Sequence, residues 1–152
     1  GMDYRWFTTI DGIVEKYNTG EDDFQVPERL LELYKEKKYG QYGNNGTLNI
    51  CFLCSNHTTG GNSGSPVINA HGELIGTAFD GNWEAMSGDI YFEPNIQRTI
   101  SVDIRYSLFI IDKYAGATHL IQEMNIVTER HNEESSETKQ DENIPEPVPS
   151  IK

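Results

Sequence analysis

The sequence is poor in positive charge, with 12 lysines and arginines against 24 aspartates and glutamates and a net charge of -12. Nucleic-acid binding depends on clustered lysine and arginine that neutralise phosphates, and anionic membrane surfaces attract the same residues. The sequence also lacks any run near the roughly 20 apolar residues that a membrane-spanning helix needs. We therefore expect neither a nucleic-acid partner nor a membrane partner.

Cysteine is scarce, and the two residues present are Cys51 and Cys54. Their C-x-x-C spacing is found in redox and zinc sites, and His57 follows three residues later. The alternation of apolar residues over 48–53, however, predicts a strand, and positions three apart on a strand point to opposite faces. A disulfide or a shared ion is then unfavourable, so we expect two partly buried thiols, no metal and no cofactor.

The C-terminal segment 128–152 differs in composition from the rest of the chain. It has no aromatic residue, its acidic residues outnumber its basic ones, and Pro145, Pro147 and Pro149 lie near its end. Such a segment cannot bury enough apolar surface to offset the entropy of ordering. We predict a disordered acidic tail, with a binding role for the tail as the alternative, and a single folded domain over residues 3–127.

The folded part is predicted to be mostly β. A strand and a turn are expected over 4–17, with a break at Asp11-Gly12. A helix is expected from Pro27, favoured at the first helical position, to Gly40, favoured at a helix end. Further strands are expected over 48–53, 66–68, 73–79 and 99–104, with a hairpin turn over 69–72 and a loop over 81–95. Apolar residues at helical spacing from Leu108 onward predict a C-terminal helix.

The segment that indicates chemistry is TTGGNSGSP, residues 58–66, directly before an expected strand. A nucleophilic serine needs an exposed hydroxyl and a backbone that turns two N–H groups toward a developing oxyanion. Gly61 permits such a turn and offers one N–H group, while Ser63 offers a second together with the attacking oxygen. By itself the pattern also fits an ordinary hairpin loop.

The surroundings of Ser63 extend this pattern. An apolar strand and the segment GELIG (72–76) follow it, and together they resemble the nucleophile region of chymotrypsin-like serine peptidases. The similar segments are FTTIDG (7–12), VPE (26–28), HTTGGNSGSPV (57–67), GELIG (72–76), FDGNWE (79–84), VDIRY (102–106) and IDKYAGA (111–117). Over residues 4–127 they resemble one bacterial family, the dipeptidyl-peptidases that include dipeptidyl-peptidases 7 and 11.

The resemblance implies an architecture. The family has a chymotrypsin-like double β-barrel capped by a helical domain, and this chain would be the C-terminal β-barrel half, with one helix before it and a C-terminal helix. Residues 3–127 are then the C-terminal part of the peptidase catalytic domain. Because 62 residues precede Ser63, we expect the triad His and Asp to lie upstream, outside the chain. The chain alone is then expected to be inactive.

The resemblance also implies partners and a location. We expect the N-terminal barrel and the helical domain of a longer enzyme as partners, and a homodimer of the full-length form. The substrates would be peptides with a free N-terminus, from which the family releases dipeptides. The family is secreted, so a periplasmic or cell-surface location is expected.

The resemblance further assigns roles to four residues. Ser63 falls on the nucleophile, and the N–H groups of Gly61 and Ser63 fall on the oxyanion hole. Asp80 falls where the family holds the peptide's α-ammonium, a charge that a carboxylate binds with charge-assisted hydrogen bonds. Gly81 falls on the position that tunes the first specificity pocket, where Arg accompanies a preference for acidic residues before the cut and Gly for hydrophobic ones. We expect the hydrophobic preference; for Asp80, a solvated turn residue is the alternative.

None of the four histidines is expected to be the triad base. His57 lies on the run into the serine loop, His71 in a hairpin turn, His119 on the last helix and His131 in the tail. Each is more typical of a surface or structural residue. The alternative function is a non-catalytic, peptidase-like module that binds a partner through its tail or its edge strands.

Overall fold

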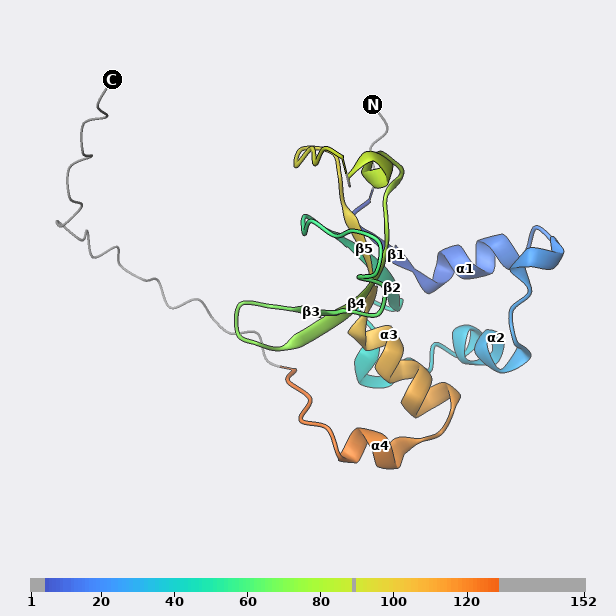
Figure 1. Ribbon diagram of the computed structural model, residues 1–152. Coiled ribbons are helices and arrows are strands. Elements are labelled where there is room, and N and C mark those ends of the chain that lie inside the picture. Colours follow the sequence, from blue (N-terminus) through green and yellow to red (C-terminus); the bar gives the residue numbers. More distant parts are fainter. Residues whose placement is uncertain (1–4, 89, 129–152) are drawn as a thin grey trace, which may run out of the picture.

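A computed structural model describes residues 5–88 and 90–128, which fold around one antiparallel sheet (Figure 1). The strands are β1 (Phe7–Thr9), β2 (Asn49–Cys54), β3 (Pro66–Ile68), β4 (Leu74–Gly81) and β5 (Thr99–Asp103). Their order in the sheet is β1-β2-β5-β4-β3. Strands β4 and β5 therefore lie inside the sheet, and the short strand β3 forms one edge beside β4.

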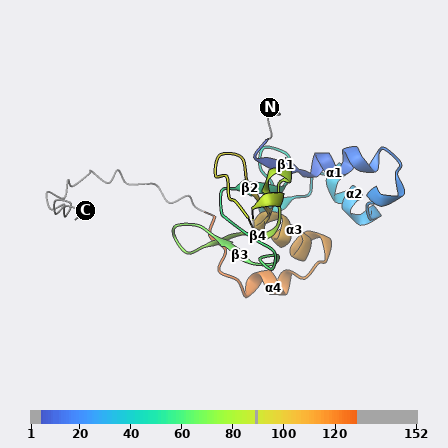
Figure 2. The ribbon, with the colours of Figure 1, turned by 45° about the horizontal axis from the view of Figure 1, so that its top comes forward.

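Helices precede, interrupt and follow the strands. They are α1 (Ile10–Tyr17), η1 (Asp22–Phe24), α2 (Glu28–Lys35), η2 (Gly40–Tyr42), η3 (Trp83–Ser87), α3 (Ile104–Phe109), η4 (Ile110–Tyr114) and α4 (Thr118–Gln122). In Figures 1 and 2, α1 and α2 project together to one side of the sheet, and α3 continues directly from β5. This places α1 and α2 away from the hairpin formed by β3 and β4.

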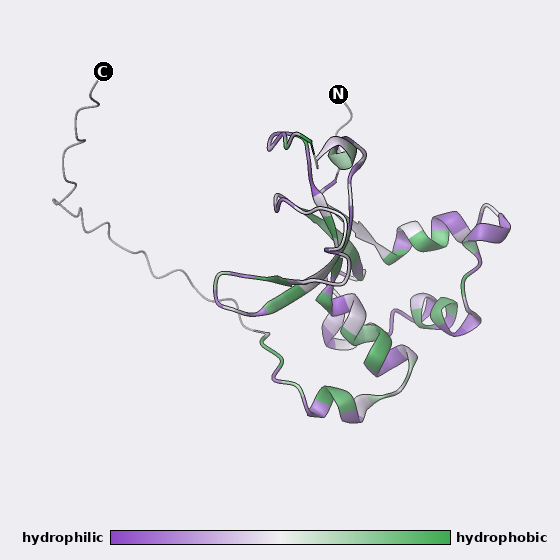
Figure 3. Cartoon of the chain, viewed as in Figure 1, coloured by the Kyte–Doolittle hydropathy of each residue, from purple (hydrophilic) through white to green (hydrophobic). Residues whose placement is uncertain are grey.

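The hydrophobic core lies among the helices rather than within the sheet. Its buried members are Ile10, Leu30, Leu33, Tyr39, Tyr42, Leu48 and Phe109. Both α1 and α2 carry hydrophobic and hydrophilic residues side by side (Figure 3), as expected of helices that bury one face. Phe109 of α3 is fully buried, so the core ties the C-terminal helices to the N-terminal ones.

The mostly β class with flanking helices is confirmed, and the predicted strands lie within a residue or two of the observed ones. The half-barrel remains a prediction, because the described strands form one sheet whose order begins at β1 and ends at β3. The predicted tail lies outside the described residues from position 129 onward. The division at residue 127 likewise stays a prediction.

The prediction for the N-terminal segment was wrong in part. Residues 10–17 form α1, so Asp11-Gly12 lies inside a helix, and two α-helices rather than one precede β2. The cause is tertiary: Ile10 is fully buried, and Asp11 accepts hydrogen bonds from residues distant in the sequence. Local propensity alone favours a turn there, and packing overrides it.

The predicted end of the second helix was also wrong. Helix α2 ends at Lys35, and Gly40 begins the 3-10 helix η2. Lys37 adopts φ +50°, and the amide of Lys38 donates to the carbonyl of Leu33 over 3.0 Å. This is the hydrogen-bond pattern that closes a helix after a left-handed residue, and here a lysine provides it instead of the glycine.

Candidate active site

Strand β4 contains a bulge that sets the geometry of the site. Its register with β5 shifts between Ala78 and Asp80, which leaves Phe79 as the extra residue. Ala78 is buried, whereas Phe79 and Asp80 are both exposed. Bulges commonly redirect side chains beside functional sites, and this one presents two consecutive residues to solvent.

The loop that carries Ser63, residues 58–66 and here called the serine loop, is hydrogen-bonded to β4 just before the bulge. The amide of Gly64 donates to the carbonyl of Ala78 over 2.8 Å, and the amide of Ala78 donates to the carbonyl of Ser65 over 2.9 Å. Gly61 and Gly64 have φ of +96° and +88°, which glycine adopts without steric cost. The loop between the two glycines is thus strongly turned and held at one end by the strand.

Asn62 stabilises the turn from within the loop. Its amide donates to the carbonyl of Thr59 over 3.2 Å, and its side-chain Oδ1 accepts from the amide of Thr59 over 2.8 Å. Its own carbonyl accepts from the amide of Ser65 over 2.9 Å. These three hydrogen bonds fix the backbone on both sides of Ser63.

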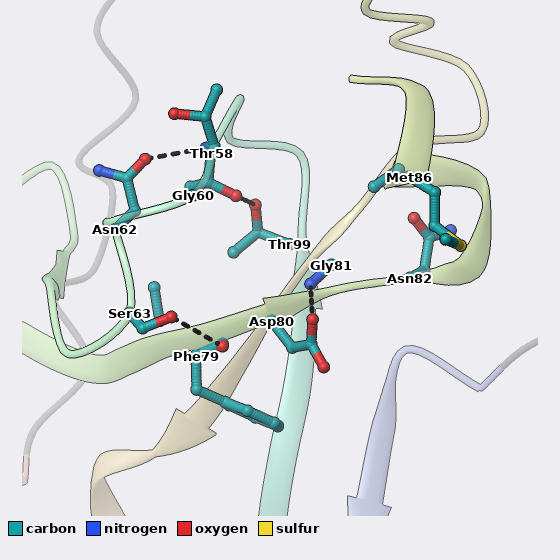
Figure 4. Close-up of a pocket in the computed structure, with 13 residues that line it drawn as sticks. Thr58, Gly60, Asn62, Ser63, Phe79, Asp80, Gly81, Asn82, Met86 and Thr99 are labelled. Carbon is teal, nitrogen blue, oxygen red and sulfur yellow. Dashed lines mark hydrogen bonds between the residues drawn. The ribbon is translucent and has the colours of Figure 1, made fainter. Parts of the chain in front are cut away.

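Ser63 itself is exposed, and its Oγ donates to the carbonyl oxygen of Phe79 over 3.2 Å (Figure 4). The backbone amides of Gly61 and Ser63 donate to no residue in the described part of the chain. The loop therefore presents one hydroxyl and two unpaired amides, the groups that the sequence predicts for a nucleophile and an oxyanion hole. The roles themselves stay predictions.

Ser63, Asp80 and Gly81 line one cavity of about 200 Å³. The other lining residues are Thr58, Thr59, Gly60, Asn62, Ala78, Phe79, Asn82, Ala85, Met86 and Thr99. Gly61 belongs to the same loop but is not among them. Within the described residues no lysine or arginine lines this cavity, and its single ionisable group is the carboxylate of Asp80.

Asp80 follows Phe79, the residue whose carbonyl accepts from Ser63, along β4 (Figure 4). Its Oδ1 accepts from the amide of Gly81 over 2.8 Å, which fixes the carboxylate against its own backbone. The second oxygen accepts no hydrogen bond from the described residues. The structure thus brings three of the four predicted site residues to one cavity and leaves one oxygen of Asp80 without a hydrogen bond from the described residues.

Two threonines that sequence reasoning missed also line this cavity. Thr99 is 2% exposed, and its hydroxyl donates to the carbonyl of Asn56 over 2.8 Å. The hydroxyl of Thr58 lies 2.6 Å from that of Thr99 and must donate to it, because Thr99 has already given its single proton. This pairing fastens the start of the serine loop to β5, and no local sequence signal indicates it.

The prediction of a loop without helices over 81–95 was wrong, because this segment contains the 3-10 helix η3. The side chain of Asn82 holds the segment in place through hydrogen bonds. Asn82 Nδ2 donates to the carbonyl of Ile96 over 2.8 Å and to Glu84 over 2.7 Å. Asn82 Oδ1 accepts from the amide of Arg98 over 2.8 Å. The segment after β4 is therefore tied back to the approach to β5, and it brings Ala85 and Met86 to the cavity.

The histidines lie elsewhere in the described part of the chain. The ring of His57 stacks on Phe92 with centroids 4.3 Å apart, and its Nε2 lies 3.4 Å from the carbonyl of Gly88. His71 lies in the turn between β3 and β4, and His119 lies in α4. None of these three lines the cavity, and His131 falls outside the described residues.

The cysteines are both free and half-buried in β2. Burial raises the pKa of the Cys51 thiol, and the thiol of Cys54 donates to the carbonyl of Thr99 over 3.7 Å. Among the residues that the structure describes, no three His, Cys, Asp or Glu side chains are grouped as metal ligands. No helix in that same part of the chain has the length and apolar character to cross a membrane.

Three comparisons place this arrangement among known proteins. Dipeptidyl-peptidase 7 of Phocaeicola vulgatus is 58% identical over 128 residues, which are 84% of this chain and 18% of that protein. The Asp/Glu-specific dipeptidyl-peptidase of Flavobacterium psychrophilum is 55% identical over 124 residues, 82% of this chain and 17% of that protein. The crystal structure of Porphyromonas endodontalis DPP11 with the dipeptide Arg-Asp matches with a TM-score of 0.77 at 50% identity, over 80% of this chain and 18% of that one.

The chain therefore spans less than a fifth of the length of these relatives. Residues 1–126 match the family described as Peptidase S46. The match extends over the sheet, the serine loop and the helices on both sides of them. On this evidence the chain belongs to the peptidase S46 family.

Proposed function

We propose that the longer protein of which this chain is a part is a serine dipeptidyl-peptidase that releases dipeptides from the free N-terminus of peptides. The observation that carries the proposal is the position of Ser63, an exposed hydroxyl in a glycine loop at the same cavity as Asp80. The names of the similar proteins, dipeptidyl-peptidase 7 and Asp/Glu-specific dipeptidyl-peptidase, support it.

Ser63 is the proposed nucleophile. Its Oγ attacks the carbonyl carbon of the second peptide bond while its proton passes to a base, and the C–N bond breaks as the leaving amine takes up a proton. Water then hydrolyses the acyl-enzyme and frees Ser63. The amides of Gly61 and Ser63 stabilise the oxyanion, and we propose that the base and its orienting carboxylate come from the part of the protein upstream of this chain.

Asp80 is the proposed anchor of the substrate's α-ammonium. Its free carboxylate oxygen opens to the cavity, and its other oxygen is held by the amide of Gly81. A fixed distance between this carboxylate and Ser63 would place the cut after the second residue. This arrangement explains exopeptidase action without any further recognition of the peptide.

A hydrophobic residue before the cut is the proposed preference. The cavity has no cationic side chain among its described lining residues, whereas Gly81, Ala85 and Met86 provide small and apolar surface. An acidic side chain would enter this space without a positive partner, at a cost in desolvation. Among the similar proteins one kind of name, Asp/Glu-specific dipeptidyl-peptidase, states an acidic preference and the other states none, so the proposed hydrophobic preference rests on the cavity alone.

The test is dipeptide release by the complete protein from a peptide with a free N-terminus and from its N-acetylated form. We expect release from the free peptide alone, and a loss of at least about 10³-fold in kcat for Ser63→Ala. Ser65→Ala is the matched control, because it removes a hydroxyl from the same loop and leaves the backbone anchors in place. Equal cleavage of both peptides, or full activity of Ser63→Ala, would refute the proposal.

A further inference from the structure

We propose that Ala85 is a further specificity-determining residue, whose methyl group occupies the space into which any side chain at position 81 would project. Residues 81 and 85 then define the side-chain pocket as a pair rather than singly. This inference rests on the proposed function, because it concerns the residue that the pocket accepts before the cut.

The evidence is the contact that a side chain at position 81 would make. A Cβ built on Gly81 lies 2.9 Å from the Cβ of Ala85, closer than Cβ atoms approach in folded proteins, and the next nearest atom is the carbonyl oxygen of Arg98 at 3.8 Å. Both Gly81 and Ala85 line the cavity. The backbone at position 81 does not itself require glycine, because its φ lies outside the left-handed region. Glycine is required there by the Cβ of Ala85.

Ala85 is held in place and has no rotamer through which to retreat. Its amide donates to the carbonyl of Asn82 over 2.9 Å, and its carbonyl accepts from the amide of Gly88 over 2.9 Å. The buried side chain of Gln97 donates to the carbonyl of Glu84 over 3.0 Å. The side chain of Asn82 in turn donates to the carbonyl of Ile96. Moving η3 away from position 81 would therefore break several hydrogen bonds.

Two consequences follow for the pocket. A cationic side chain at position 81, which would attract an acidic residue before the cut, fits only if position 85 gives up its Cβ. Conversely, the pair Gly81 and Ala85 adds no positive charge to the cavity, which Met86 also lines. A change of preference from a hydrophobic to an acidic residue before the cut therefore needs substitutions at both positions. A cationic residue at position 81 alone impairs the pocket, and glycine at position 85 alone leaves the preference unaltered.

The experiment is a double-mutant cycle in the complete protein, with Gly81→Arg, Ala85→Gly and the two combined. The readout is kcat/KM for two dipeptidyl substrates that differ only in leucine or glutamate before the cut. We expect Gly81→Arg to lose at least about 10-fold on both substrates, Ala85→Gly to keep the leucine preference, and the combination to prefer glutamate by at least about 10-fold. The matched control Gly81→Arg with Ala85→Ser retains a Cβ at position 85 and should stay impaired.

A second measurement covers the case in which Gly81→Arg does not fold. Gly81→Ala introduces the Cβ alone, so it should lower the Tm, and Ala85→Gly should restore it in the combined variant. The inference is overturned if the effects on Tm and on the substrate ratio simply add, or if Gly81→Arg alone switches preference fully. A wild-type protein that releases no dipeptide refutes the proposed function and this inference with it, whereas an active, Ser63-dependent enzyme with additive variants refutes the inference alone.

Discussion

At the scale of single residues, the site depends on hydrogen bonds that hold the loop backbone while the amides of Gly61 and Ser63 stay unpaired among the described residues. The loop around Ser63 is held by Asn62 and by Ala78 of β4, so its backbone is fixed while its hydroxyl makes one 3.2 Å bond to the carbonyl of Phe79. Rotation about one side-chain bond would free this hydroxyl for the role proposed for it. The loop is thus built before any substrate binds, as preorganised stabilisation of an oxyanion requires.

Asp80→Asn tests the proposed ammonium anchor. The amide of asparagine still accepts from Gly81, so the bulge is kept and only the negative charge is lost. Hydrogen bonds to charged groups contribute about 1.5–3 kcal/mol, and we therefore expect kcat/KM on a free peptide to fall roughly 10- to 100-fold. The measurement is kcat/KM in the complete protein, with Glu123→Gln, an exposed carboxylate at the end of α4, as the charge-matched control. An unchanged value for Asp80→Asn would leave Asp80 as a solvated residue of β4 with no role in binding.

The sequence predicts the candidate site residues better than it predicts the residues that hold or shape the site. The pattern around Ser63 marks the loop because glycine and serine have distinct backbone and chemical roles there. Thr99 and Ala85 carry no such mark, since their importance comes from neighbours 41 and four residues away. In the sequence alone, a threonine in a strand and an alanine in a 3-10 helix look the same whether or not they line a cavity.

At the scale of elements, the N-terminal helices are joined through one carboxylate. Asp11 of α1 accepts from Thr9 over 2.9 Å and from the hydroxyl of Tyr34 in α2 over 3.1 Å. It also accepts from the hydroxyl of Thr47, just before β2. The hydrogen bond from Thr47 is the main cause that lowers the pKa of Asp11, although burial opposes it. This network converts a sequence that locally favours a turn into α1.

Asp11→Asn is expected to reduce the stability of the chain in a pH-dependent manner. Because the folded pKa lies below the unfolded one, the carboxylate stabilises the fold above the unfolded pKa, and this contribution disappears as the pH falls through the folded value. We expect a loss of about 1–2 kcal/mol in the free energy of unfolding at pH 7 and a smaller difference at pH 3, measured by urea unfolding. Asp22→Asn, at an exposed carboxylate of η1, is the control. An equal difference at both pH values would contradict the role of the charge.

The elements that sequence predicts well are those with a local cause. Strands β3, β4 and β5 are predicted by short apolar runs and by the turn at 69–72. In this turn the backbone amide of Asn69 donates to the carbonyl of Glu73 over 2.9 Å. Neither the bulge at Phe79 nor the end of α2 at Lys35 follows from the local sequence. The bulge is set by pairing with β5, and the helix end is set by the backbone hydrogen bonds that close it around Lys37. The part of the cavity wall that η3 provides, Ala85 and Met86, was missed for the same reason.

At the scale of the whole molecule, the account depends on residues that this chain does not contain. It spans less than a fifth of its relatives, and the described histidines do not line the cavity that holds Ser63. A serine hydroxyl without a base is a weak nucleophile at neutral pH. In our account the site is completed only when the upstream part of the protein is present.

The most direct measurement of this account is covalent labelling of Ser63 by a fluorophosphonate, located by mass spectrometry of peptides. We predict that the complete protein gains one adduct on the peptide that contains Ser63, that Ser63→Ala abolishes it, and that the 152-residue chain alone reacts negligibly. A complete protein that remains unlabelled at Ser63, or that is labelled there as slowly as the isolated chain, would contradict the account.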